Sequence, residues 1–171
     1  MSSKNLATQK IDSFVKELAS AEPAPGGGAA AALVAALGAA LYAMVGRIIL
    51  ARKDTTPEQK QTLQPVVRSC DQAHKALLKL MDQDAKAYAA WKKTGAMGQA
   101  LEVPLAIAER ATEVMKFTPK LIESSSKSLK SDVTSGFGFL RSGFVAAYAT
   151  AAGNLRTLRR GSLKDKFAKR I

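Results

Sequence analysis

Apolar residues recur along this chain with the spacing of three to four positions that is typical of helices. Between residues 6 and 20, for example, Leu6, Phe14 and Leu18 fall on one helical face. No segment shows the sustained alternation of β-branched and polar residues that marks half-buried strands. The chain is 47% hydrophobic but only 6% aromatic, so small and aliphatic residues that favour helices supply most of its core. The pattern predicts an all-α fold, a bundle of about five to six helices in a single domain over residues 1–171.

Helix-breaking and helix-capping residues set the expected bounds of these helices. Pro23 and Pro25 stop the first helix, and Thr56 with Pro57 supplies an N-cap and a first helical turn. The expected helices cover about residues 6–20, 28–51, 57–93, 103–124, 132–159 and 163–170, with a bend near Pro65, an interruption at Pro119 and loops at 94–102 and 124–131.

Two of these helices, 28–51 and 132–159, interleave Gly and Ala with large apolar residues and carry few charges. A domain of this size has difficulty hiding both helices inside itself, and a two-fold dimer is the commonest way to cover such surfaces. We therefore expect a homodimer through these Ala/Gly-rich helices.

The uncharged segment 28–46 is long enough to be considered as a membrane span. Gly and Ala dominate it, so its transfer into lipid is weakly driven, and a helix buried in a helical assembly is the preferred interpretation. The first ten residues lack the apolar stretch of a signal peptide. We expect a cytoplasmic protein that is not associated with a membrane.

The 26 basic residues exceed the 14 acidic ones and give a net charge of +12. This surplus attracts nucleic acid, membrane surfaces or poly-acidic small molecules, or it serves solubility alone. The basic residues are spread along the chain without a recognition helix or a stacking platform, which argues against nucleic acid as a partner. Cys70 and His74 are the single residues of their types, which excludes a disulfide within the chain and argues against a metal site.

One carboxylate falls on an apolar helix face. Asp84 lies in line with Leu77 and Tyr88, whereas Asp82 points about 200° away, toward lysines. Burial of a carboxylate is costly, and desolvation raises its pKa toward the range that is useful for proton transfer. Asp84 is therefore the candidate acid–base residue. A carboxylate at the edge of the stripe that reaches water or a lysine would give the same periodicity.

Further positions suit ligand binding. Gly26, Gly27 and Gly28 precede the second helix, where converging backbone N–H groups form an anion or carbonyl site, or where the chain simply makes a tight turn. Asp132 stands at the expected start of the last long helix, as an N-cap or as a polar group at a pocket mouth. Arg141 lies among apolar residues of that helix, as a snorkelling edge residue or as an anchor for an anion.

Taken in order, these segments resemble the family that joins the C-terminal domain of bifunctional formiminotransferase-cyclodeaminase with stand-alone methenyltetrahydrofolate cyclohydrolases. The resemblance spans about residues 11–154 and rests on a helix entry of the Pro-Gly-Gly-Gly type combined with an Asp-x-Asp-Ala-x-Ala-aromatic segment. The residues that carry it are Phe14-Val15, Leu18-Ala19-Ser20, Pro23 to Gly28, Ala29 to Gly38, Met44-Val45, Asp82 to Tyr88, Val103-Pro104-Leu105, Ala108-Glu109 and Ser131-Asp132.

The resemblance implies a helical homodimer without a metal, with a folate pocket lined by Gly26, Gly27, Gly28, Asp84 and Asp132. It implies closure of 5-formimidoyltetrahydrofolate to the 5,10-methenyl form with loss of ammonia, and Asp84 suits the proton transfer. The family also handles polyglutamylated folates, for which the net charge and Arg141 offer a rationale.

Two other functions stay open. One is a methenyltetrahydrofolate cyclohydrolase, which converts the 5,10-methenyl to the 10-formyl form, and the other is a non-catalytic basic helical binding protein. The sequence assigns no role to Asp82, His74 or Asn154.

Overall fold

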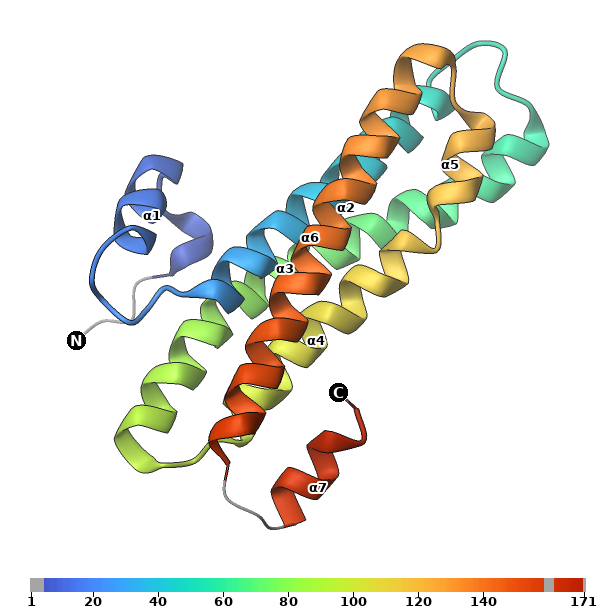
Figure 1. The fold of residues 1–171 in the computed structure, drawn as a ribbon. Helices are drawn as coiled ribbons and strands as arrows, with labels where there is room; N and C mark the ends of the chain where they lie inside the picture. The colour runs from blue at the N-terminus through green and yellow to red at the C-terminus, as the bar shows by residue number, and fades with distance from the viewer. Residues whose placement is uncertain (1–4, 159–161, 171) are drawn as a thin grey trace.

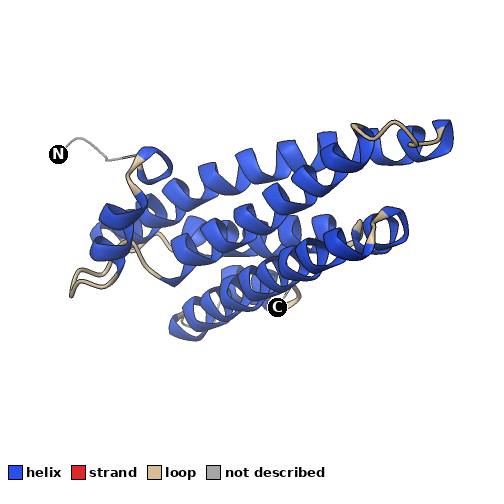
Figure 2. Ribbon diagram, turned by 90° about the horizontal axis from the view of Figure 1, so that it is seen from above, coloured by secondary structure: helices blue, strands red, loops and turns tan. Residues whose placement is uncertain are grey.

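The computed structural model describes residues 5–158 and 162–170, and this part of the chain contains helices and no strands (Figures 1 and 2). The expected all-α fold is confirmed. The long helices are α2 (Gly27–Leu50), α3 (Pro57–Thr94), α4 (Gly98–Met115) and α6 (Lys127–Thr157). The short ones are η1 (Leu6–Thr8), α1 (Ile11–Leu18), α5 (Thr118–Ser124) and α7 (Ser162–Ala168).

Helix α2 packs against α3 on one side and α6 on the other, and α4 packs on α6 and α3 (Figure 1). By length and composition α2 is long and apolar enough to cross a membrane. Its small residues are largely buried against the neighbouring helices, among them Ala32, Ala35 and Ala39, which have no exposed surface. A core helix of a helical bundle therefore accounts for its composition.

Glycines allow α2 and α6 to approach closely. A Cβ atom on Gly38 would stand 2.7 Å from the carbonyl oxygen of Gly136, and one on Gly143 would stand 2.7 Å from the Cβ of Ala35. Part of the interleaved Gly and Ala pattern thus serves packing within one chain. Both helices nevertheless expose large apolar side chains, namely Leu37, Met44, Ile48, Phe137, Phe139 and Val145.

Three of the expected bounds were wrong. The first helix is divided into η1 and α1, and α4 begins at Gly98 rather than near 103. This early start buries Ala100 and Leu101 against Phe167 of α7, a contact that outweighs the loop character of the glycine. Helix α6 begins at Lys127 after the N-cap Ser126.

Asp132 consequently lies inside α6 and does not open it. The polar Ser/Lys stretch looked like a loop because its many serines have modest helix propensity. Buried Leu129 and Val133, four positions apart, anchor these turns to the core. The N-terminus of α3, in contrast, forms the expected cap, since Thr56 and Gln59 hydrogen-bond each other's backbone N–H groups at 3.1–3.2 Å.

The close α2–α6 contact predicts opposite effects for two identical substitutions in α6. Gly143→Ala places a methyl group against Ala35 and should lower the free energy of unfolding by about 1–3 kcal/mol. Gly138→Ala meets open space and should raise it by about 0.5–1 kcal/mol, because alanine restricts the unfolded chain more than glycine. Urea unfolding followed by circular dichroism measures both values, and a Gly143→Ala protein as stable as wild type would contradict the packing.

Candidate functional site

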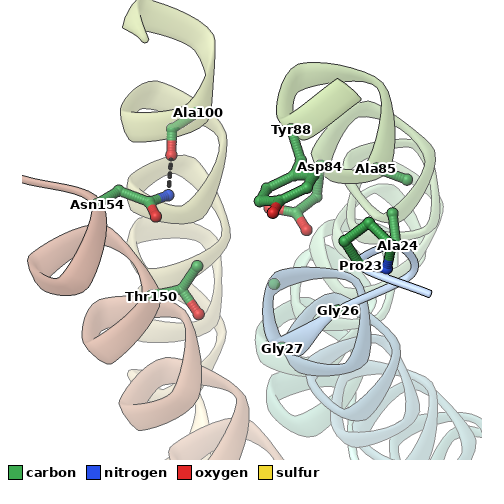
Figure 3. Close-up of a pocket in the computed structure, with 11 residues that line it drawn as sticks. Pro23, Ala24, Gly26, Gly27, Asp84, Ala85, Tyr88, Ala100, Thr150 and Asn154 are labelled. Carbon is green, nitrogen blue, oxygen red and sulfur yellow. Dashed lines mark hydrogen bonds between the residues drawn. The ribbon is translucent and has the colours of Figure 1, made fainter. Parts of the chain in front are cut away.

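A cavity of about 150 Å³ lies at one end of the bundle, where the N-terminus of α2 meets α3, the start of α4 and the C-terminal half of α6 (Figure 3). The residues that line it are Pro23, Ala24, Gly26, Gly27, Gly28, Asp84, Ala85, Tyr88, Ala100, Thr150 and Asn154. The structure thus brings together the predicted catalytic residue and all three predicted glycines.

Asp84 is the titratable group of this cavity. Its carboxyl group accepts a hydrogen bond from the backbone N–H of Ala29, which favours the charged form. Burial has the larger effect and raises the pKa of Asp84 from its usual value of 3.8 to about 6. A carboxyl group with such a pKa exchanges protons readily near neutral pH, as acid–base catalysis requires.

The Gly26–Gly28 segment provides the space for this carboxyl group. Helix α2 has Gly26 at its N-cap position and therefore no capping side chain of its own. Asp84 reaches across from α3 and takes that place. A Cβ atom on Gly28 would overlap all three carboxyl atoms of Asp84, so any other residue at position 28 would displace them. The glycine run is thus more than a turn between two helices.

The opposite wall of the cavity comes from α6, where Thr150 and Asn154 face Asp84 and Tyr88 across the gap (Figure 3). The Nδ2 atom of Asn154 donates to the carbonyl oxygen of Ala100 at 2.7 Å. The sequence analysis assigned no function to Thr150 or Asn154, and it placed Tyr88 only on the apolar face that carries Asp84. Two polar side chains four positions apart on an Ala-rich helix were the available signal.

Asp82 has a structural contact outside the cavity. Its Oδ1 atom accepts a hydrogen bond from the backbone N–H of Leu6 at 2.5 Å, and the side chains of Leu6 and Phe14 are buried. This contact fixes the N-terminal segment on α3, ahead of the turn that carries Pro23 and Ala24 to the cavity. The two aspartates of one motif therefore lie in different surroundings, as their opposite helical faces predicted.

Asp132 and Arg141 do not line this cavity. Asp132 precedes Thr150 by 18 positions of α6, which corresponds to about 27 Å along the helix. Arg141 precedes it by nine positions, about half a turn out of phase, and its exposed side chain borders a separate surface groove with Val145 and Ala149. Their contact with a ligand remains a prediction.

Other reactive side chains lie outside the cavity. Cys70 is buried in the core, and burial raises the pKa of its thiol to about 12, which leaves it protonated and inert. His74 lies 3.6 Å from Asp71, which also bonds Arg47. Within residues 5–158 and 162–170, no group of three or more His, Cys, Asp or Glu side chains is placed to hold a metal ion.

Comparisons with known proteins agree on one family. Over 187 aligned residues the chain is 30% identical to formimidoyltransferase-cyclodeaminase from Rattus norvegicus, covering 98% of this chain but 34% of the rat protein, so it spans about a third of that relative's length. It is 29% identical to methenyltetrahydrofolate cyclohydrolase from Methylorubrum extorquens, over 85% of this chain and 80% of that protein.

The fold matches a solved structure. Formiminotetrahydrofolate cyclodeaminase from Thermotoga maritima superposes with a TM-score of 0.87 over 95% of this chain and 86% of that one, at 21% identity. The family model for formiminotransferase-cyclodeaminase matches residues 10–171, nearly the whole sequence. The chain therefore belongs to the formiminotransferase-cyclodeaminase family.

Proposed function

We propose that this protein is a folate one-carbon enzyme that closes 5-formimidoyltetrahydrofolate to 5,10-methenyltetrahydrofolate and releases ammonia. The observation that carries the proposal is the Asp84 carboxyl group. It lies in the cavity, packed against Gly28, and burial raises its pKa to about 6. The relative from Methylorubrum extorquens is named for a folate one-carbon reaction and the rat relative for a cyclodeaminase, which supports the substrate class and the reaction type.

The proposed reaction needs one proton carrier. N10 of the folate attacks the carbon of the protonated formimidoyl group, and the N10 proton passes to the Asp84 carboxylate as the new C–N bond forms. Asp84 then gives this proton to the amino nitrogen on the same carbon. The C–NH₂ bond breaks, ammonia leaves, and the methenyl cation remains. A carboxyl group with a pKa near the working pH suits both transfers.

The cavity holds the reacting end of such a substrate rather than the whole molecule. Its volume of about 150 Å³ is below the roughly 300–1,000 Å³ of pockets that enclose a drug-sized ligand. The aminobenzoyl and glutamate parts of a folate would therefore extend beyond it, toward the protein surface.

A cyclohydrolase is the second candidate function, favoured by the relative from Methylorubrum extorquens, which matches most of both chains. In that reaction water adds to the methenyl carbon, and Asp84 would accept a proton from the water. One spectrophotometric assay that follows methenyltetrahydrofolate separates the two functions, because the compound appears in the first reaction and disappears in the second. Binding of folate without either change would indicate a non-catalytic protein.

We predict that Asp84→Asn keeps the fold and loses turnover by about 100-fold or more. Asparagine can still accept the hydrogen bond from Ala29, but it cannot carry the proton. Initial rates with both folates, together with the circular dichroism spectrum, test this. A variant with near-wild-type rates would show that Asp84 only caps α2.

The pH dependence supplies a second readout of the same prediction. The wild-type kcat/KM should rise with pH around a midpoint of about 6 as Asp84 ionises. Because the folded-state pKa exceeds the unfolded one, the folded protein binds this proton more tightly. The free energy of unfolding of the wild-type protein, compared with that of Asp84→Asn, should therefore fall as the pH rises from about 4 to about 6.

We also propose that the chain forms a homodimer through the apolar surface of α2 and α6. Leu37, Met44 and Ile48 are 50%, 37% and 41% exposed and share one face of α2. Such a row of large apolar side chains on a core helix is typical of an interface.

Leu37→Glu should convert the dimer into a monomer, because a charge in this surface cannot be desolvated without a partner. Light scattering after gel filtration would then give the chain mass of 18.1 kDa in place of twice that value. Ile11→Glu is the control, since Ile11 is 79% exposed on the separate helix α1 and should leave the dimer intact. A monomeric wild-type protein would refute the proposal.

The basic surplus is proposed to hold the glutamate tail outside the cavity. Affinity should rise from a monoglutamate to a pentaglutamate folate at low salt and lose this difference as salt is added. Arg141→Lys should weaken binding of the pentaglutamate more than binding of the monoglutamate. The guanidinium group of arginine binds a carboxylate through two hydrogen bonds, which lysine cannot do. Arg110→Lys is the control, since Arg110 pairs with Glu113. Isothermal calorimetry measures these affinities. Equal affinities for the monoglutamate and the pentaglutamate at low salt would contradict the proposal and leave solubility as the role of the net charge.

A further inference from the structure

A proline inside α4 leaves one carbonyl group of that helix without its normal partner. In an α-helix the carbonyl oxygen of Ala100 would accept the N–H group of residue 104, but residue 104 is proline and has none. The amide of Asn154 donates to this oxygen instead, at 2.7 Å, and joins α6 to α4. Pro104 is buried, and Ala100 lines the cavity.

This contact sets the orientation of the Asn154 amide. A carbonyl oxygen can only accept, so the Nδ2 side of the amide must face Ala100 and the Oδ1 side must face away from it. Asn154 lines the cavity from α6, and Asp84 lines it from the opposite wall (Figure 3). Among the described residues no donor bonds the Oδ1 atom of Asn154. The cavity is therefore flanked by a fixed amide acceptor and by a carboxyl group.

We propose that Asn154 is a specificity-determining residue whose fixed Oδ1 atom selects a one-carbon group that carries N–H donors over one that carries oxygen. Pro104 is a positioning residue in this arrangement, because it frees the carbonyl group that orients the amide. The inference rests on the proposed folate function and names the feature of the substrate that the cavity recognises.

The two folate derivatives differ at the atom that Asn154 would meet. A formimidoyl group is an amidine, and its nitrogen donates hydrogen bonds at neutral pH. A formyl group ends in an oxygen that only accepts, so it leaves Oδ1 without a partner and places two acceptors against each other. A ligand that covers this acceptor without supplying a donor leaves it unpaired, and such a loss discriminates strongly between ligands of equal size.

The experiment compares the KM for 5-formimidoyltetrahydrofolate with the inhibition constant of 5-formyltetrahydrofolate in the same assay. For wild type the inhibition constant should exceed the KM by at least tenfold. Asn154→Leu, which has similar size and no polar group, should reduce this ratio by fivefold or more, mainly by raising the KM. If that variant does not fold, Asn154→Ala removes the same acceptor with a smaller side chain.

Pro104→Ala returns an N–H group that competes for the carbonyl oxygen of Ala100, and it should lower the same ratio. It should have no further effect in the Asn154→Leu background, because it acts through Asn154. Pro65→Ala is the matched control, since Pro65 also lies inside a long helix but is exposed and far from the cavity lining.

Each outcome decides between the two proposals. An unchanged ratio in a folded, active Asn154→Leu protein overturns the inference and leaves the proposed function intact. Additive effects of the two substitutions overturn the role of Pro104. A wild-type protein that neither converts nor binds either folate overturns the proposed function, and the inference fails with it.

Discussion

The contact between Asp84 and the N-terminus of α2 is the interaction on which the site depends. The helix begins at glycine and has no cap of its own, so its first N–H groups need an acceptor from elsewhere. Asp84 provides it through Ala29, and the absence of a side chain on Gly28 makes room for the carboxyl group. The helix dipole favours the charged form and burial opposes it more strongly, which leaves the pKa near 6. One carboxyl group thus closes a helix end and has a raised pKa that suits proton exchange near neutral pH.

On the other wall of the cavity a side chain also satisfies an unpaired backbone group, but there the side chain donates the hydrogen bond and the backbone accepts it. There a proline removes a donor and leaves a carbonyl group, rather than an N–H group, for a side chain of another helix to satisfy. Asp84 and Asn154 are therefore both held by backbone groups that their neighbouring helices leave unpaired. Groups fixed in this way lose little freedom when a ligand arrives, which is the condition for preorganised binding.

Periodicity predicted the fold and half of the site for identifiable reasons. The helical spacing of apolar residues and the capping box at Thr56 reflect local physics, and a carboxylate on an apolar face pointed to Asp84, which lines the cavity. The α4 start at Gly98 and the α6 start at Lys127 were missed because tertiary burial of Ala100 and Leu129 overrides weak local propensity. Thr150 and Asn154 could not be joined to Asp84, since nothing local relates residues 66 or more positions apart.

The small residues that make α2 resemble a membrane span in composition also let it pack closely on α6, and this close packing limits the width of the cavity. Glycines at 38 and 143 let α2 and α6 lie nearly backbone to backbone, and this separation carries through to the helix ends. There a Cβ atom on Gly27 would stand 3.4 Å from the hydroxyl of Thr150, so the two walls remain close where the cavity opens. A narrow cavity keeps Asp84 partly out of water and places Asn154 on the wall that faces it. The Ala- and Gly-rich composition of two helices, read first as a sign of association between chains, is thus also what brings the reactive groups of one chain together.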